Sequence, residues 1–313
     1  MGGNVFEGRT TCIKQENIIP TLDSYFSELR RIFPNRSTIF NVDYFQPVGS
    51  VGKKAESGDI DLAIDTTSIL DAGMSTSSIA EWGINPLDVD AEYVILEKRA
   101  RTSSPSQLKM KAFLKTLASY ANDHSTTLLF NQKKTTDGNL FSCYPQIDQH
   151  GNTLGVEVQI DWMIGNIKWL KFSYYSALIP PGSNVKGLHR TQLMLSAFQV
   201  ANLSFNHVSG IKDKETGEVL ATDPELALKI LSYRLGVDLT QDDAENYYTL
   251  HSILKNGLSH NDYQKLLDIY FKILDSTRAD IPDDLQTYWL SRRHVLDLSG
   301  KFLPEDSKLK GLL

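Results

Sequence analysis

The most constraining feature of this chain is a short run, Asp59 to Asp65, in which acidic and apolar residues alternate. Ile60, Leu62 and Ile64 occupy every second position of the run, and aspartates occupy three of the others. Successive side chains of a β-strand point to opposite faces, so this alternation predicts a strand with one apolar face and one acidic face. We therefore expect a sheet that buries the apolar face of this strand.

The surrounding sequence predicts a mixed region of helices and strands that extends to about residue 180. Two segments repeat apolar residues at steps of three and four, which is typical of helices that bury one face. Four segments are rich in β-branched and aromatic residues or alternate in polarity, which favours strands. The turn residues Gln149 to Asn152 separate the last two strands, so we expect these two to be antiparallel. We expect helices over 15–33 and 108–122, strands over 37–48, 92–98, 140–147 and 154–163, and an irregular or short helical connection over 66–90.

Helical periodicity dominates the sequence after residue 180. An amphipathic segment covers 188–203, and the segments from Pro224 onward space their apolar residues as helices do. We therefore predict an α+β fold with two domains, a mixed domain over 1–180 and a helical domain over 181–313. The later helices of the second domain are expected near 224–235, 240–256, 260–276 and 283–297.

The composition fits a two-domain globular chain and argues against several other classes. The 313 residues correspond to about two domains at roughly 150 residues each. No apolar run approaches the ~18 residues that a membrane helix needs, and the first residues show no signal-peptide pattern. Two cysteines cannot form a disulfide framework, so we expect a reducing, cytoplasmic setting. A net charge of -6 argues against a protein that coats nucleic acid through its overall charge.

The residues before the acidic strand form a candidate phosphate-binding loop. Gly49 and Ser50 end the preceding strand, where glycine lets the backbone approach a ligand and a serine hydroxyl can hold a phosphate. Asp59 and Asp61 then lie two residues apart on one strand face. Two carboxylates this close repel each other unless a cation lies between them, and Mg²⁺ prefers such oxygen ligands and shares them with phosphates.

This stretch resembles the signature of the DNA polymerase β-like nucleotidyltransferase superfamily. The signature is a Gly-Ser pair, a short loop and an Asp-x-Asp motif between hydrophobic residues. The resemblance implies a small mixed β-sheet with flanking helices, the nucleotidyltransferase fold, followed here by the helical domain. The matching residues are Gly49-Ser50, Lys53-Lys54, Ala55-Glu56-Ser57 and Gly58-Asp59-Ile60-Asp61-Leu62.

The resemblance also implies a third carboxylate on a neighbouring strand, and Asp161 fits that position. Glu157, Gln159 and Asp161 share one face of the predicted strand. Asp161 is preferred over Glu157 because similar enzymes place a lone aspartate inside a hydrophobic strand after a hairpin. Asp59, Asp61 and Asp161 are then the expected catalytic residues and the expected ligands of Mg²⁺ or Mn²⁺.

The chemistry that the resemblance implies is transfer of a nucleotide from an NTP by two metal ions. Asp59 and Asp61 would bridge the ions, one of which holds the triphosphate while the other lowers the pKa of the attacking hydroxyl. Asp161 would bind the second ion and take the proton of the hydroxyl. The α-phosphate is attacked in line, and pyrophosphate leaves.

A second group of candidate residues opens the helix after residue 180. Lys186, His189 and Arg190 are spaced to share one face of the first helical turn, where a helix N-terminus attracts anions. We interpret them as a clamp for the triphosphate of the nucleotide, with a solvated first turn as the equal alternative. Tyr174 and Tyr175 could stack on a base, although packing inside the fold is the favoured interpretation.

Three functional hypotheses remain open on the sequence alone. The first is template-independent addition of nucleotides to an RNA 3′ end, favoured by the chain length, the helical second domain and a basic run between residues 98 and 115. The second is an enzyme that uses the same chemistry to make a cyclic or short oligonucleotide, or to nucleotidylate a protein or small molecule. The acidic composition favours this second hypothesis. The third is an inactive binding module, against which the three retained acids argue. The basic run comprises Lys98, Arg99, Arg101, Lys109, Lys111 and Lys115, for which a solvated face is the default interpretation.

Overall fold

The computed structural model describes residues 5–71, 73–100, 103–177 and 182–291. The chain divides into two compact units, Met1–Lys171 and Phe172–Leu313. The fold is mixed α+β with a central mixed sheet, as the sequence predicts. The division falls after Lys171, earlier than the expected boundary near residue 180, and residues 178–181 at that expected boundary lie outside the described residues.

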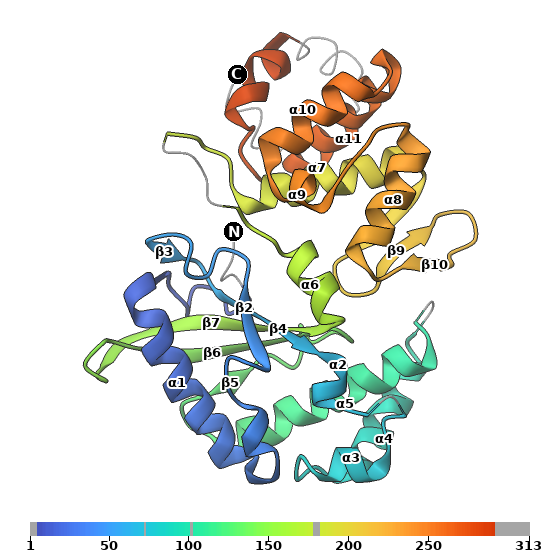
Figure 1. The fold of residues 1–313 in the computed structure, drawn as a ribbon. Coiled ribbons are helices and arrows are strands. Elements are labelled where there is room, and N and C mark those ends of the chain that lie inside the picture. The colour runs from blue at the N-terminus through green and yellow to red at the C-terminus, as the bar shows by residue number, and fades with distance from the viewer. Residues whose placement is uncertain (1–4, 72, 101–102, 178–181, 292–313) are drawn as a thin grey trace. The chain divides into compact units, whose positions relative to one another are not determined.

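A five-stranded sheet forms the centre of the first unit (Figure 1). In order across the sheet, its strands are β2 (Phe45–Val48), β4 (Ile60–Asp65), β7 (Thr153–Gly165), β6 (Asn139–Ile147) and β5 (Leu129–Phe130). β4 and β7 run parallel, and the other neighbouring pairs are antiparallel. The predicted antiparallel hairpin is therefore confirmed as β6 and β7. A separate two-stranded sheet pairs β1 (Ile13–Lys14) with β3 (Glu56–Ser57).

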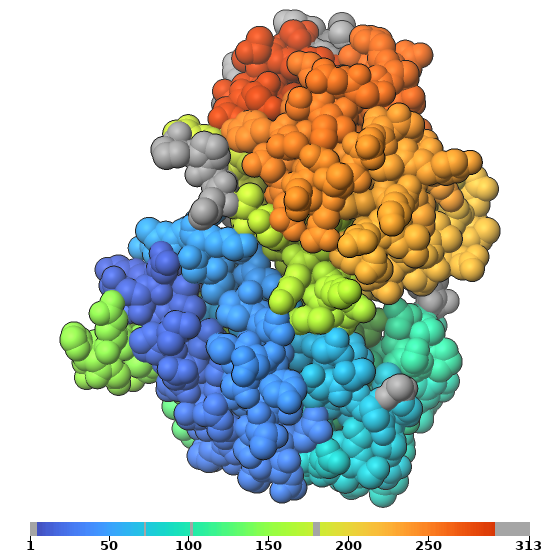
Figure 2. All heavy atoms as spheres, viewed as in Figure 1, coloured from blue at the N-terminus to red at the C-terminus, as the bar shows by residue number. Residues whose placement is uncertain are grey.

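Two long helices bury their apolar faces in the core of this unit, as predicted. They are α1 (Gln15–Ile32) and α5 (Pro105–His124). α1 is tied to the sheet by Tyr25, whose hydroxyl lies 2.9 Å from Ser142 Oγ and accepts a hydrogen bond from the Trp162 indole at 2.7 Å. Figure 2 shows the green tip of the β6–β7 hairpin projecting past the dark blue α1.

The prediction of a strand over 92–98 is wrong. These residues belong mostly to helix α4 (Pro86–Glu97). Asn85 caps the helix with its side chain, and Pro86 occupies the first helical position, where its missing N–H costs nothing. A start signal for a helix was therefore present in the sequence, and it outweighs the β-branched and aromatic residues that follow.

The prediction of one extended segment over 37–48 is only partly right. Residues Pro34–Ile39 form a 3₁₀ helix, η1, and only β2 at the end of the segment pairs in the sheet. Of the irregular or short helical connection expected over 66–90, the helical form is the one observed. Its two helices before α4 are α2 (Thr66–Ile69) and α3 (Thr76–Ala80).

The second unit is mainly helical but contains a small sheet that the sequence analysis missed. α6 (Ile167–Ser173) crosses the division between the units, and α7 (Gly187–Val200) accounts for the predicted helix over 188–203. The missed sheet consists of the antiparallel strands β8 (Leu203–Asn206), β9 (Gly210–Asp213) and β10 (Val219–Ala221). The elements that follow are α8 (Pro224–Leu235), α9 (Gln241–Glu245), α10 (Tyr247–Gly257), α11 (His260–Ser276) and the 3₁₀ helix η2 (Asp283–Leu285).

Residues 292–297, at the end of the helix expected near 283–297, lie outside the described residues. Within the part of the chain that the structure describes, no helix combines the length and the apolar composition that crossing a membrane requires.

Candidate metal centre

The parallel pairing of β4 and β7 brings the predicted acids together. Asp61 and Asp161 occupy the same register position on these neighbouring strands. Side chains at one register position of adjacent strands lie on the same face of the sheet, and Asp59 precedes β4 by one residue. The expectation that Asp161 lies beside Asp59 and Asp61 is confirmed, because carboxylate oxygens of all three lie within 4.8 Å of one another.

Burial and mutual repulsion perturb these carboxyl groups. Asp161 is 4% exposed, while Asp59 and Asp61 are half-buried. Burial, followed by the charges of Asp59 and Asp161, raises the pKa of Asp61 well above its ordinary value. Burial and the charge of Asp59 also raise the pKa of Asp161, which a hydrogen bond from Gln159 partly offsets. Three acids held this close destabilise the fold, and a divalent cation would offset that cost.

The hydrogen bonds of Asp161 leave one of its oxygens for a ligand. Oδ2 accepts a hydrogen bond from Gln159 Nε2 at 2.8 Å. Oδ1 is buried and has no hydrogen-bond partner among the described residues. A buried polar atom without a partner is uncommon because it carries a desolvation cost, and a carboxylate oxygen is the ligand type that Mg²⁺ and Mn²⁺ prefer. The residues present therefore fit a divalent cation.

Gln159 contacts the acidic cluster through Asp161, a contact that the sequence interpretation did not single out. Its Oε1 accepts a hydrogen bond from the Val5 N–H at 3.0 Å, which orients the amide so that Nε2 donates to Asp161. The signal available in the sequence was its place on the same strand face as Asp161. Glu157, the alternative third acid, is instead bound by Arg9, with Nη2 at 2.7 Å from Oε1. This pairing agrees with the choice of Asp161.

The loop before β4 passes so close to Asp61 that glycine is required at position 49. A Cβ added to Gly49 would lie 2.5 Å from Asp61 Oδ2, which is closer than the Cβ atoms of folded proteins come to a non-bonded atom. Gly49 and Gly52 also have positive φ values of 66° and 71°, which favour glycine. This close approach is to a carboxylate of the cluster, and the predicted approach of the Gly49 backbone to a ligand stays a prediction. Ser50 is half-buried beside it, and its phosphate-binding role stays a prediction.

The structure gives the basic residues around the start of α7 different surroundings. Lys186 is exposed and forms an ion pair with Asp280, with 2.9 Å between Nζ and Oδ2. His189 is 0% exposed, and its Nδ1 accepts a hydrogen bond from the N–H of Lys186. Burial lowers the pKa of His189 to about 4, so this side chain is neutral at pH 7.

Arg190 is committed to the interior of the second unit. It is 2% exposed, and it donates from Nε to the Ala244 carbonyl at 2.6 Å and from Nη1 to the Phe172 carbonyl at 2.8 Å. Its guanidinium lies 4.7 Å from the centre of the Phe172 ring. Burial lowers the pKa of Arg190 to about 10, which leaves it charged at pH 7. The three basic side chains are therefore not exposed as one face, and their role as a triphosphate clamp stays a prediction without support from this geometry.

The two tyrosines before this helix also lie within the second unit. The Tyr174 ring packs against His207, with 5.0 Å between the ring centres. Tyr175 is half-buried, and burial raises its pKa. The contact of Tyr174 agrees with the favoured interpretation that it packs inside the fold, and base stacking stays a prediction for both residues.

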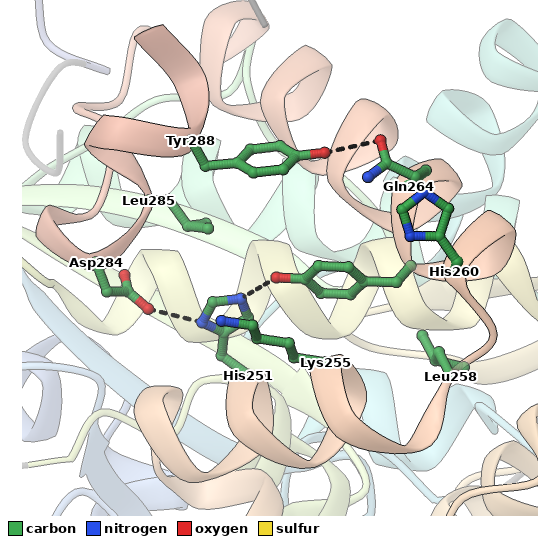
Figure 3. Close-up of a pocket in the computed structure, with 9 residues that line it drawn as sticks. His251, Lys255, Leu258, His260, Gln264, Asp284, Leu285 and Tyr288 are labelled. Carbon is green, nitrogen blue, oxygen red and sulfur yellow. Dashed lines mark hydrogen bonds and ion pairs between the residues drawn. The ribbon is translucent and has the colours of Figure 1, made fainter. Parts of the chain in front are cut away.

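The second unit contains a pocket of about 470 Å³ around His251 (Figure 3). His251 Nδ1 lies 2.6 Å from Asp284 Oδ2, and its Nε2 lies 2.8 Å from the Tyr263 hydroxyl. Tyr247 donates to the other oxygen of Asp284 at 3.0 Å. Burial raises the pKa of Tyr263 to about 12, so its hydroxyl is a poor nucleophile at neutral pH. This network connects α10, α11 and η2, and we assign it a structural role.

Comparison with known proteins adds no family assignment. A scan against family models found no match for this chain, and a search of curated proteins found none either. The chemical interpretation therefore depends on the acidic cluster and on the motif that precedes it. Three carboxylates that converge in this way can hold divalent cations and, through them, phosphate groups.

Proposed function

We propose that this chain is a metal-dependent nucleotidyltransferase that moves NMP from an NTP to a hydroxyl acceptor and releases pyrophosphate. The observation that carries the proposal is the convergence of Asp59, Asp61 and Asp161 within 4.8 Å on adjacent strands. The loop at Gly49 and Ser50 supports it, because this order of loop and acids resembles the DNA polymerase β-like superfamily. The proposal assigns the first unit to the nucleotidyltransferase fold of that superfamily.

The roles of the residues follow from their surroundings. Asp59, Asp61 and Asp161 would hold Mg²⁺ or Mn²⁺, which when bound supplies positive charge at the triphosphate and lowers the pKa of the acceptor hydroxyl. Ser50 would donate a hydrogen bond to a phosphate oxygen of the NTP. Asp161, oriented through Oδ2 by Gln159, would take the proton of the acceptor hydroxyl. The hydroxyl oxygen then forms a bond to the α-phosphorus as the bond from that phosphorus to the leaving pyrophosphate breaks.

The acceptor that we favour is the 3′ end of an RNA, extended without a template. This choice rests on the size of the chain and on its mainly helical second unit. The net charge of -6 favours an alternative, in which the same chemistry makes cyclic or short oligonucleotides or modifies a protein or small molecule. A small acceptor needs no long basic track, so this alternative fits an acidic chain.

The test incubates the purified protein with each common NTP, labelled in the α-phosphate, with Mg²⁺ or Mn²⁺ and with or without a short RNA. The proposal expects the α-label in a product and no transfer from a γ-labelled NTP. Elongated RNA supports tailing, whereas labelled products formed without RNA support cyclisation, oligonucleotide synthesis or self-modification. Absence of α-label transfer under all these conditions would contradict the proposal.

A pair of matched variants connects the activity to the site. Asp61→Asn should abolish product formation because it removes a charged ligand while preserving the shape of the side chain. Asp90→Asn makes the same exchange at an exposed position of α4 and should keep wild-type activity. Product formation by Asp61→Asn at the wild-type rate would show that the acidic cluster does not carry the reaction.

A further inference from the structure

The first unit contains a basic hollow whose lining includes no residue of β4 or β7, the strands that carry Asp61 and Asp161. It has a volume of about 600 Å³ and is lined by the end of α4 and the residues that follow it, by α5 and by the loop between β5 and β6. α4 and α5 pack side by side (Figure 1). Leu96 and Leu108 give the hollow an apolar part. Its charged lining consists of Arg99, Lys111, Lys115 and Lys133.

Positive charge is concentrated in this region, in contrast to the chain as a whole, which is acidic. Residues 98–122 include six lysines and arginines and no aspartate or glutamate, in a chain whose net charge is -6. Repulsion between neighbouring cations destabilises such an arrangement unless an anion binds there. A concave surface with apolar walls strengthens the local potential further, because less water screens the charges.

Two of the four cations of the hollow are anchored to the fold, Lys115 through its side chain and Lys133 through its backbone. Lys115 is half-buried and forms an ion pair with Glu92 of α4. The loop that carries Lys133 is fixed because Asn131 Oδ1 accepts a hydrogen bond from the N–H of Lys133 at 3.1 Å. Among the described residues, Arg99, Lys111 and Lys133 form no ion pair with an acid. Three positive charges therefore remain for a ligand.

We propose that this hollow binds a compact ligand that carries two or more phosphate groups. Its volume falls in the range of ~300–1,000 Å³ that is typical of small-molecule pockets. Cations that converge from three elements suit a compact polyanion, whereas a nucleic-acid strand is bound along an extended groove. Lysines act as point charges and arginine as a planar fork, and both groups bind phosphate oxygens. The apolar part at Leu96 and Leu108 can contact an organic portion of the ligand.

This proposal is independent of the proposed function, because it uses none of the residues of the acidic cluster. The test measures binding of inorganic tripolyphosphate to the full chain by calorimetry at low ionic strength, with EDTA present so that metal-dependent binding is excluded. The pocket variant is the double exchange Lys111→Glu and Lys133→Glu. The control variant, Lys98→Glu with Lys109→Glu, makes the same change in net charge at neighbouring positions that do not line the hollow.

The expected result is a rise in the dissociation constant of about tenfold or more for the pocket variant and less than about threefold for the control. Binding should also weaken as NaCl is added. Circular dichroism checks the fold, and the milder pair Lys111→Gln and Lys133→Gln should weaken binding in the same direction if charge reversal unfolds the chain. Two outcomes overturn the proposal: no binding of tripolyphosphate, whether or not a short RNA binds in a pocket-dependent way, or equal weakening by both double variants.

Discussion

Replacing Asp61 by asparagine should make the metal-free protein more stable, although it damages the candidate metal centre. Asp61 lies within 4.8 Å of two other carboxylates. At an effective dielectric constant of about 20, two unit charges about 5 Å apart repel by roughly 3 kcal/mol. Protonation of one acid relieves most of this repulsion, and solvent screens half-buried groups. We therefore expect the free energy of unfolding to rise by about 1–2 kcal/mol at neutral pH.

The sign of the pH dependence follows from the raised pKa values of Asp61 and Asp161. A carboxyl group whose pKa is higher in the folded than in the unfolded state stabilises the fold below its unfolded pKa. That contribution is lost as the pH rises through the folded pKa. The advantage of Asp61→Asn over the wild type should therefore be small near the ordinary aspartate pKa of about 4 and should grow as the pH rises above it.

Urea unfolding in EDTA, followed by circular dichroism over this pH range, measures the effect. Asp90→Asn serves as the control, because an exposed exchange of this kind should change the free energy of unfolding by no more than about 0.5 kcal/mol. If Asp61→Asn is as stable as the wild type or less stable at neutral pH, the reasoning is refuted. The three carboxylates would then not repel one another as their separation requires.

Three other substitutions test the surroundings of the site and of the second unit. Gly49→Ala should lower metal-dependent activity by roughly tenfold to a hundredfold, because the Cβ of the new alanine displaces a carboxylate of the cluster. Gly52→Ala introduces similar backbone strain but has nothing within 4 Å of its Cβ, so it should keep most activity. Equal losses of activity in the two variants would contradict the account. Gln159→Leu should move the acidic limb of the pH–rate profile to higher pH, because Asp161 loses a donor that lowers its pKa, and an unchanged profile would exclude this role. Arg190→Ala should lower the free energy of unfolding by about 2–4 kcal/mol, since two buried carbonyls lose their hydrogen-bond donor. A raised KM for the NTP with unchanged stability would instead favour the predicted role of Arg190 in a triphosphate clamp.

The acidic cluster could be predicted from strand periodicity together with the family resemblance. Alternation puts Asp59 and Asp61 on one face, whereas Asp161 was expected beside them because the resemblance implies a third carboxylate on a neighbouring strand. Periodicity does not give the register of two strands far apart in the sequence, so the pairing of Asp61 with Asp161 depends on packing. The burial of Arg190 could not be predicted either, because its carbonyl partners lie 18 and 54 positions away in the sequence and meet it only through packing.

The wrongly predicted segments show where local pattern and packing disagree. Val94 and Ile95 favour a strand by residue type, yet they are 45% and 44% exposed on the helix that contains them. Preference for a strand reflects the fit to a half-buried sheet surface, which this segment does not meet. The strands of the second unit were missed because the longest of them has four residues, too few for alternation to stand out.

Binding of Mn²⁺, followed by electron paramagnetic resonance, tests the central claim most directly. The account predicts that the wild-type chain binds Mn²⁺ and that Asp61→Asn and Asp161→Asn each weaken this binding by about tenfold or more. Asp90→Asn should bind Mn²⁺ as the wild type does. Unchanged Mn²⁺ affinity in the Asp61 and Asp161 variants would contradict the account, because the three carboxylates would then not be the ligands of the metal.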